Sequence, residues 1–318
     1  MLDSRSEVVA VPGAAMAHET PARSSPRWYW HPYNRAAFYR VAEALGRLPR
    51  PVRLAAARRL GRLAARALPA ERAAVRSALE TFTAERGPRL DGLTARVFGD
   101  FAMCFSDLVS TNRRPAPRLL SCVEDVIGAG RLAAVTGGVV SITAHVGNWE
   151  LAGRLLATRT ARTTHVVVAP EEAPALERWV RRDGDGMRFV PRAHPGVGVE
   201  LLAALRRGDA VALQGDRALG TRGDVVLPFF GRPAPFPLGP FLLARAAGVP
   251  VVPAFCLLGA RQRYRVRIAD PIVVKGGDAE AAAAAWVGLL ESVVRAHPTQ
   301  WFNFFDVWRP FGGGPVAP

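Results

Sequence analysis

The stretch VVSITAHVGNWEL (residues 139–151) joins an apolar run to a polar turn and then to a helix-forming segment. Residues 139–144 carry no charge and are mostly β-branched, which is typical of a strand covered on both faces. Asn148 suits the N-cap of the following helix, and Glu150 falls in its first turn, where the helix dipole favours negative charge. The pattern predicts a central strand, a turn and a helix, with His145 at the carboxyl end of the strand.

From residue 123 onward, short apolar runs alternate with helix-forming segments. The predicted strands cover 139–144, 164–169, 187–191, 210–214, 250–255 and 264–269. The predicted helices between and after them cover 149–158, 174–182, 196–207, 239–247 and 279–296. Such alternation is typical of a mostly parallel sheet covered on both faces. We expect the α/β class, with a mostly parallel central sheet flanked by helices and an N-terminal helical extension.

Composition divides the chain into four expected regions. The first residues are rich in Ser, Pro and Ala, which is typical of disorder. A helical pattern follows, and a further helix is predicted at about 91–111. The expected regions are a disordered tail (1–27), a helical, membrane-associating region (28–122), an α/β core (123–310) and a flexible tail (311–318).

Residues 52–68 have the pattern of a basic amphipathic helix. The apolar residues that share one face are Leu54, Ala57, Leu60, Leu63 and Ala64. The arginines that occupy much of the remainder are Arg53, Arg58, Arg59, Arg62 and Arg66. One interpretation is an ordinary helix whose apolar stripe faces the core. The other is a helix on a membrane surface, with its arginines on anionic headgroups.

The chain of 318 residues has 42 basic and 27 acidic residues, a net charge of +15. This charge favours anionic partners such as phospholipid headgroups, an acidic carrier protein or nucleic acid. The arginines are spread along the chain without a nucleic-acid-reading motif, so nucleic acid is not the expected partner. The 3 cysteines lack zinc-ligand spacing, which argues against a metal site and favours a reducing, cytoplasmic environment. We expect no transmembrane helix, because the longest apolar stretch, 238–260, contains Arg245 and several prolines.

His145 and Glu150 lie five positions apart across the predicted turn. A corner between strand and helix could bring the two side chains together. A carboxylate on one imidazole nitrogen fixes the tautomer and leaves the other nitrogen as a general base. The alternative is structural: His145 is a hydrogen-bonded residue at a strand end, and Glu150 complements the helix dipole. Spacing alone leaves both interpretations open.

Four blocks, in order along the chain, resemble a known enzyme family. They are TAHVGNWELAG (143–153), LRRGDAVALQGDRALG (205–220), LPFFGRPAPFPLGPFLLARAAGVPVVPAF (227–255) and HPTQWFNFF (297–305). The first is similar to the HxxxxD/E block of the glycerolipid acyltransferase superfamily. Its HxGNWE form resembles the lipid A biosynthesis (late) acyltransferase family, which includes phosphatidylinositol mannoside acyltransferases.

By this resemblance, His145 is the catalytic base and Glu150 its charge partner. The implied reaction moves a fatty acyl chain from an acyl carrier protein or coenzyme A thioester to a hydroxyl of a lipid or glycolipid acceptor, of lipid A type or related. The resemblance implies no resident cofactor. A GxSxG nucleophile motif is absent, so no covalent acyl-enzyme is expected. The expected location is the cytoplasmic face of the bacterial inner membrane, held peripherally on an anionic surface.

The same blocks imply a set of substrate-binding residues. The candidates are Asn148, Arg181, Arg182, Arg192, Asp216, Phe229, Phe230 and Gly231. The three arginines follow from the family's habit of placing an arginine after the second strand. Asp216 resembles a family aspartate and is expected either to shape the pocket or to cap a turn. The two phenylalanines are expected either to fill the core or to form a wall for the acyl chain.

Several alternatives stay open. The ending WFNFFDVW (301–308) differs from that of many lipid A enzymes, so lysophospholipids and other lipids remain possible acceptors. A non-catalytic lipid-binding protein is disfavoured, because His145 and Glu150 are both present. A nucleotide-binding enzyme is suggested only by GAGRLA (128–133), which we expect in a helix rather than in a strand-to-helix turn.

Overall fold

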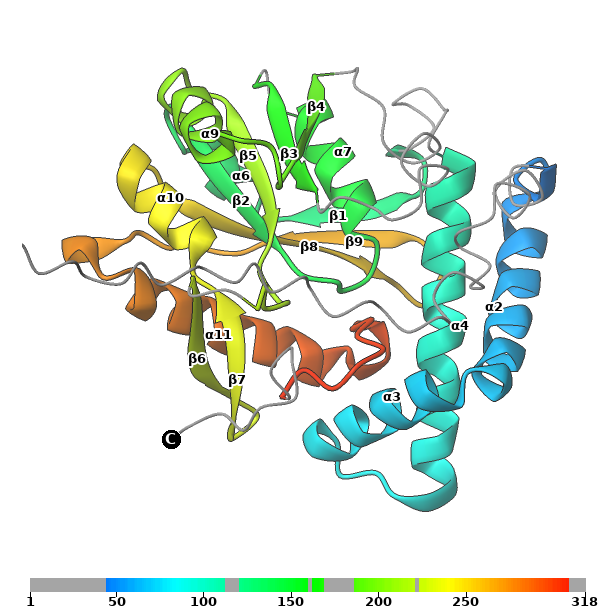
Figure 1. Ribbon diagram of the computed structural model, residues 1–318. Coiled ribbons are helices and arrows are strands. Elements are labelled where there is room, and N and C mark those ends of the chain that lie inside the picture. The colour runs from blue at the N-terminus through cyan, green and yellow to red at the C-terminus, as the bar shows by residue number, and fades with distance from the viewer. Residues whose placement is uncertain (1–43, 112–119, 160–161, 169–185, 221–222, 309–318) are drawn as a thin grey trace, which may run out of the picture.

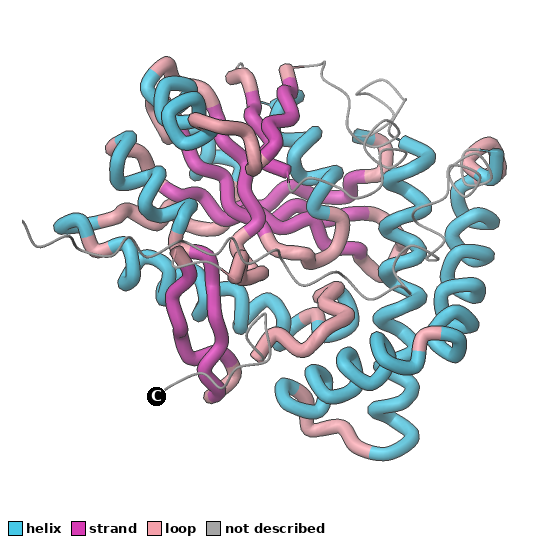
Figure 2. The backbone as a smooth tube through the Cα atoms, in the orientation of Figure 1, coloured by secondary structure: helices cyan, strands magenta, loops and turns pink. Residues whose placement is uncertain are grey.

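The computed structural model describes residues 44–111, 120–159, 162–168, 186–220 and 223–308. These residues form a seven-stranded sheet with helices packed around it and a two-stranded hairpin (Figures 1 and 2). The sheet strands are β1 (Val123–Ile127), β2 (Val139–Thr143), β3 (Thr164–Val168), β4 (Met187–Pro191), β5 (Ala210–Gln214), β8 (Val251–Leu258) and β9 (Tyr264–Ile268). The hairpin strands are β6 (Asp224–Phe229) and β7 (Arg232–Pro237).

The strand order is β1-β9-β8-β2-β5-β3-β4. Strands β8, β2, β5, β3 and β4 run parallel, β9 runs antiparallel to β8, and β1 runs parallel to β9. The mostly parallel sheet and all the predicted strands are therefore confirmed. Strand β1 and the hairpin were not predicted, because adjacent acidic residues interrupt β1 and prolines interrupt β6 and β7.

The helices are α2 (Arg50–Ala67), α3 (Pro69–Phe82), α4 (Gly87–Thr111), α6 (Ala129–Ala133), α7 (Trp149–Arg159), α9 (Val197–Arg206), α10 (Gly239–Ala247) and α11 (Ala279–Ala296), with 3-10 turns η3 (Lys275–Gly277) and η4 (Pro298–Gln300). They confirm the predicted helices except 174–182, which lies outside the described residues, as do the two predicted tails.

No helix in the described ranges has the length and apolar character needed to span a bilayer. Residues 128–133 do form a strand-to-helix turn, contrary to expectation, but α6 there has only 5 residues.

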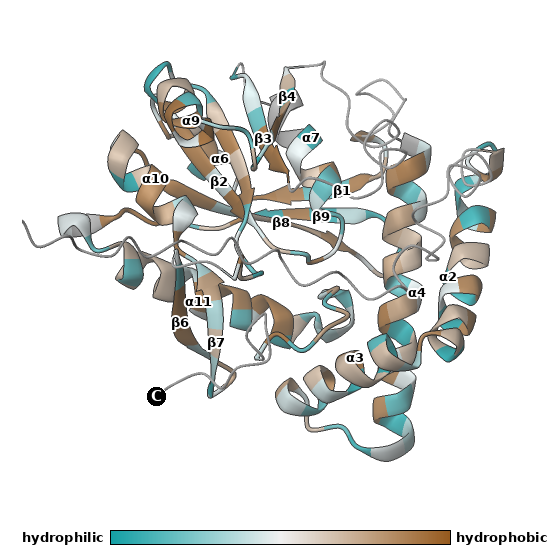
Figure 3. Cartoon of the chain, viewed as in Figure 1, coloured by the Kyte–Doolittle hydropathy of each residue, from teal (hydrophilic) through white to brown (hydrophobic). Residues whose placement is uncertain are grey.

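The core lies where α11 packs against the sheet, and the middle strands are its most hydrophobic part (Figure 3). Trp286 of α11 is fully buried and stacks on Phe255 of β8, with ring centroids 5.6 Å apart. Its indole Nε1 donates a 2.8 Å hydrogen bond to the carbonyl oxygen of Gly215, just after β5. Helix α11 therefore holds the carboxyl end of β5 in place.

The connections of the parallel strands leave the sheet on opposite faces. The chain crosses from β2 through α7 to β3 in one direction along the sheet. After β4, the edge strand beside β3, the chain runs in the other direction: through α9 to β5, and then through α10 to β8. Because such crossovers are right-handed, α7 lies on one face and α9 and α10 on the other. The neighbours β2 and β5 therefore flank a topological switch point, where open α/β sheets bind ligands beyond the carboxyl ends of their strands.

Helix α2 packs along α4 at the edge of the molecule through a close glycine contact (Figure 1). A Cβ atom on Gly61 would lie 2.4 Å from the carbonyl oxygen of Phe98 and 2.7 Å from the Cβ of Ala102. The buried face of α2 consists of Arg53, Leu54, Gly61 and Ala65. The close approach of the two helices selects small residues for this face and directs larger ones outward.

The predicted apolar stripe is therefore wrong in part. Leu54 is fully buried, but Leu60 and Leu63 are 60% and 53% exposed. Their exposure contradicts the interpretation of an ordinary helix whose whole apolar stripe faces the core.

The α2–α4 contact predicts opposite effects for two glycine-to-alanine substitutions. Gly61→Ala should lower the free energy of unfolding by about 1–3 kcal/mol, because the new methyl group overlaps the backbone of α4. Gly92→Ala, within α4, meets nothing within 4 Å and should raise it by about 0.5–1 kcal/mol through helix propensity. Denaturant unfolding of both variants measures the difference, and equal stabilities would disprove the close contact.

Candidate active site

The register of β2 and β5 brings His145 and Asp216 together. Thr143 pairs with Gln214 at the ends of these strands, and each candidate residue lies two positions beyond its strand. The His145 Nδ1 atom is 2.8 Å from Asp216 Oδ1. The two residues lie at the switch point of the sheet, so the carboxylate that contacts the ring comes from the neighbouring strand.

Asp216 is held from several sides in the interior. Its Oδ2 accepts hydrogen bonds from the His145 backbone N–H (3.0 Å), Trp301 Nε1 (3.0 Å) and Asn303 Nδ2 (3.4 Å). Burial by itself raises the pKa of this carboxyl group. The charge and hydrogen bonds of His145 and the charge of Arg217 outweigh burial, and hold the pKa of Asp216 well below its usual range. Asp216 is therefore ionised at neutral pH.

The ionised carboxylate determines the tautomer of the imidazole. A carboxylate only accepts hydrogen bonds, so His145 Nδ1 carries the proton and Nε2 carries the lone pair. Among the described residues, Nε2 has no hydrogen-bond partner, and His145 lines a cavity. The free lone pair is the arrangement that a general base requires.

Burial and the positive charge of Arg217 lower the pKa of His145, while Asp216 opposes them. The net direction is downward from the ordinary value of 6.5. The ring is therefore mostly neutral at pH 7 and available to accept a proton.

Backbone hydrogen bonds clamp the turn that carries His145. Phe302 N–H donates to the His145 carbonyl oxygen (2.7 Å), Gly147 N–H to Gln300 (2.8 Å), and Asn148 N–H to Cys256 (2.8 Å). Gly147 has a φ of 61°, and a Cβ atom there would lie 2.1 Å from the Cys256 carbonyl oxygen. The turn thus requires glycine both for its left-handed backbone and for the close approach of β8.

A cavity of about 960 Å³ opens beside the His145 ring. Its apolar lining includes Phe101, Phe105, Leu108, Leu213, Phe302 and Phe304. Trp149 also lines it, with its ring centroid 4.9 Å from that of His145. The described residues contain no group of three or more His, Cys, Asp or Glu side chains placed to hold a metal ion. The lining is therefore mostly apolar, with His145, Glu150 and Arg217 among its polar groups.

Glu150 does not make the expected contact with the ring. The single hydrogen bond of the His145 ring within the described residues goes to Asp216. Glu150 lies in the first turn of α7 and lines the same cavity. Its backbone at the helix start runs away from the strand end, whereas β5 delivers Asp216 alongside. The expected pairing is thus corrected, and a catalytic role for Glu150 stays a prediction.

The other predicted residues divide into three groups. Asn148 and Arg192 line the cavity, and Asn148 also caps α7, because its Oδ1 accepts the Leu151 N–H at 3.2 Å. Arg181 and Arg182 lie outside the described residues.

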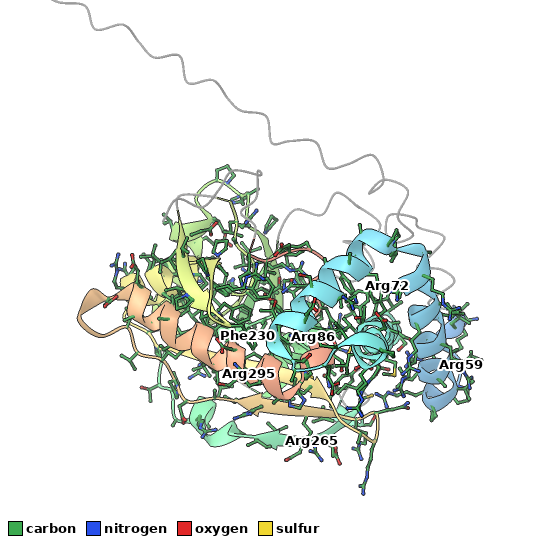
Figure 4. The ribbon with its side chains drawn as sticks, turned by 90° about the horizontal axis from the view of Figure 1, so that it is seen from below. Arg59, Arg72, Arg86, Phe230, Arg265 and Arg295 are labelled. Atoms are coloured by element: carbon green, nitrogen blue, oxygen red, sulfur yellow. The ribbon has the colours of Figure 1, made fainter. Side chains whose placement is uncertain are left out.

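Phe229, Phe230 and Gly231 do not line this cavity, and their role in substrate binding stays a prediction. Phe229 is fully buried, and Gly231, with a φ of 73°, turns the β6–β7 hairpin. Phe230 packs under the Arg295 guanidinium, 4.9 Å from its ring centroid (Figure 4). Phe229 belongs to the hydrophobic core and contacts the Trp301 ring at a centroid distance of 5.3 Å, and Phe230 packs against the core, so the core interpretation fits both phenylalanines.

Sequence analysis missed three residues of the site: Arg217, Trp301 and Asn303. Arg217 lines the cavity and donates from Nε to Asn303 Oδ1 (2.8 Å) and from Nη2 to the Phe302 carbonyl oxygen (2.9 Å). All three residues lie inside blocks quoted for the resemblance. Arg217 directly follows Asp216, and Trp301 and Asn303 belong to the QWFN segment, and these positions could have identified them as site residues.

Two substitutions should shift the pKa of His145 in opposite directions. Arg217→Gln should raise it, because a nearby positive charge is removed. Asp216→Asn should lower it further, because the imidazolium loses its carboxylate. NMR titration of the ring measures both shifts, with His145→Gln to assign the signal. Shifts in the same direction would contradict the electrostatic arrangement described here.

This chain is similar to known acyltransferases. A phosphatidylinositol mannoside acyltransferase of Mycobacterium tuberculosis (strain CDC 1551 / Oshkosh) is 30% identical over 281 residues, which cover 78% of this chain and 86% of the relative. One of the same name from Mycolicibacterium smegmatis is 26% identical over 175 residues, covering 54% and 57%.

Among solved structures, the 1-acyl-sn-glycerophosphate acyltransferase PlsC of Thermotoga maritima matches with a TM-score of 0.35 and 16% identity, over 69% of this chain and 87% of that one. The sequence profile of the bacterial lipid A biosynthesis acyltransferases matches residues 23–310. With a match over most of its length, this chain belongs to the bacterial lipid A biosynthesis acyltransferase family and is an acyltransferase that acts on lipid substrates.

Proposed function

We propose that the protein transfers a fatty acyl chain from a thioester to a hydroxyl of a glycosylated phospholipid, with His145 as general base and Asp216 as the acid that orients it. The observation that carries this proposal is the open Nε2 of His145, a residue that lines a mostly apolar cavity of about 960 Å³. A base beside an apolar cavity suits a reaction between an acyl chain and an alcohol.

The transfer proceeds by direct attack. The acceptor hydroxyl gives its proton to His145 Nε2 as its oxygen bonds to the thioester carbonyl carbon. The resulting imidazolium is stabilised by Asp216, which holds the Nδ1 proton. The C–S bond then breaks, and the thiolate leaves with the proton from Nε2. Because the ring must be neutral to begin, kcat/KM falls as the pH drops through the lowered pKa of His145.

The negative charge that develops on the carbonyl oxygen needs a positive charge or hydrogen-bond donors to stabilise it. The amides of Gly147 and Asn148 donate to Gln300 and Cys256. Arg217 lines the cavity and carries a positive charge beside His145, so we assign the stabilisation of the oxyanion to its guanidinium group, which hydrogen bonds to Asn303 and to the Phe302 carbonyl oxygen hold in place.

The donor thioester that we favour is acyl carrier protein, because the chain carries a net charge of +15 and electrostatic steering favours an acidic protein partner. Acyl-coenzyme A, also anionic, is the alternative. The acyl chain lies against the aromatic lining of the cavity, where burial contributes about 0.8 kcal/mol for each methylene group. No resident cofactor takes part in this scheme.

The acceptor that we favour is a mannosylated phosphoinositide. The support is the curated relatives, which are named phosphatidylinositol mannoside acyltransferases and align over 78% of this chain at 30% identity. A lipid A precursor and lysophospholipids are the alternative acceptors.

The face of α2 that we propose to meet the membrane combines exposed leucines with arginines. Leu60 and Leu63 are more than half exposed. The arginines around them are Arg59, Arg62 and Arg66, which line a basic hollow together with Arg72 of α3. Figure 4 shows Arg59 pointing away from the body of the protein. Leucines among arginines suit peripheral binding to anionic lipid, on the cytoplasmic face of the inner membrane.

Isosteric acid-to-amide substitutions separate the roles of the two candidate acids. Asp216→Asn should lower kcat by on the order of 10²–10⁴-fold, because the ring loses its fixed tautomer. Glu150→Gln should cost less, because the ring contacts Asp216. Transfer of labelled acyl chains from acyl carrier protein or coenzyme A to a mannosylated phosphoinositide measures both. Equal losses would refute Asp216 as the orienting acid, and full activity of His145→Ala would refute the mechanism.

Flotation with lipid vesicles tests the membrane face. Replacing Arg59, Arg62 and Arg66 by Gln should weaken binding to vesicles that contain anionic phospholipid by at least about tenfold. The control variant replaces Arg261, Arg265 and Arg267 by Gln, an equal loss of charge from exposed residues around β9. Equal losses in both variants, or binding indifferent to salt, would count against α2 as the contact.

A further inference from the structure

A chain of buried polar contacts runs from α2 to the turn that carries His145. Asp107 of α4 is 1% exposed and accepts hydrogen bonds from Arg50 (2.7 Å) and Arg53 (2.7 Å) of α2. The Tyr264 hydroxyl of β9 lies 2.9 Å from Asp107 Oδ2. Asn148 Nδ2 lies 3.2 Å from the same hydroxyl oxygen. The contacts thus join residues from four separate parts of the chain.

The direction of each hydrogen bond follows from the chemistry of the groups. Burial raises the pKa of Tyr264 well above its ordinary value, so the phenol keeps its proton. Both carboxylate oxygens of Asp107 are bound by guanidinium groups and act as acceptors. Tyr264 therefore donates to Asp107, and its oxygen accepts from Asn148. The phenol can bridge the two residues only in this direction.

This bridge determines which way the Asn148 amide points. Nδ2 donates both to Tyr264 and to the Cys104 carbonyl oxygen, 3.3 Å away. Oδ1 consequently faces the Leu151 N–H and caps α7. Asn148 is 3% exposed, and its whole side-chain amide is engaged by the protein. Asn148, the N-cap of α7 three residues after His145, is therefore positioned by the phenol.

Stability alone does not account for such a network. Replacing buried ion pairs by apolar residues of similar volume is often neutral or stabilising. A fully satisfied polar network instead selects one arrangement of the groups around it. Tyr264 is fully buried and does not line the cavity, so it does not contact substrate.

We infer that Tyr264 is a positioning residue: its hydroxyl, anchored by Asp107 between Arg50 and Arg53, holds Asn148 and so fixes the turn that presents His145 to the substrate. The inference rests on the proposed acyl transfer for its kinetic consequence. It adds a requirement that lies outside the cavity and outside the four sequence blocks.

The kinetic test removes the hydroxyl alone. Tyr264→Phe should lower kcat by about 10- to 100-fold, because a misplacement of about 1 Å can cost on the order of 10²-fold. The KM of the acyl donor should change by less than about threefold, since the cavity wall is intact. Thr94→Val is the matched control, because it deletes another fully buried hydroxyl of the same region, bonded to the Leu90 carbonyl oxygen on α4. It should leave kcat within about twofold.

A double-mutant cycle tests whether Tyr264 acts through Asn148. Asn148→Ser keeps an N-cap oxygen but loses both amide donors. In that background, Tyr264→Phe should change kcat by less than about twofold. Losses that multiply, or a Tyr264→Phe variant as active as Thr94→Val, would overturn the inference. If Tyr264→Phe does not fold, Arg50→Lys, which keeps the charge but loses the two-point contact with Asp107, should lower kcat severalfold, and unchanged kcat would overturn it.

Amide hydrogen exchange separates this inference from the proposed function. The Leu151 and Ala152 amides should exchange faster in Tyr264→Phe than in the wild type or in Thr94→Val. This result supports positioning even if the wild type transfers no acyl chain to any acceptor offered, an outcome that would overturn the proposed function alone. Unchanged exchange would overturn the positioning role whatever the activity.

Discussion

The contact between His145 Nδ1 and Asp216 is the interaction on which the rest of the site depends. It exists because β2 and β5 are neighbouring parallel strands that end at the same level, while their connections leave the sheet on opposite faces. Trp301 and Asn303 complete the hydrogen bonding of the carboxylate, so that a buried charge is tolerated. The pairing of these two strand ends therefore places the carboxylate against the imidazole.

The N-terminal helices are attached to this centre by contacts of two different kinds. Gly61 lets α2 lie against the backbone of α4, which directs Leu60 and Leu63 to the outside. Asp107, on α4, binds two arginines of α2 and the phenol of Tyr264. The first contact leaves these leucines exposed, and the second links the same helix, through Tyr264 and Asn148, to the turn that carries His145. The helix that we propose to face lipid and the turn that carries His145 are thus both attached to α4.

The differences between expectation and structure have identifiable physical causes. Alternation of apolar strands and helices predicted the sheet, because that pattern reflects burial on both faces. The stripe of α2 was placed wrongly, because a helical period gives the relative directions of side chains but not which direction faces the partner helix. The two phenylalanines of the hairpin were ambiguous for a similar reason: core and cavity wall require the same apolar residues.

The sequence by itself determined the α/β class, the strand end that carries His145, the N-cap role of Asn148 and, through its quoted blocks, the family. Only the tertiary structure decided which acid contacts the imidazole. Glu150 is near His145 along the chain, but Asp216 is near it in space, 71 residues away. Strand pairing is a long-range property, so no local spacing encodes the partner that a neighbouring strand brings to the ring.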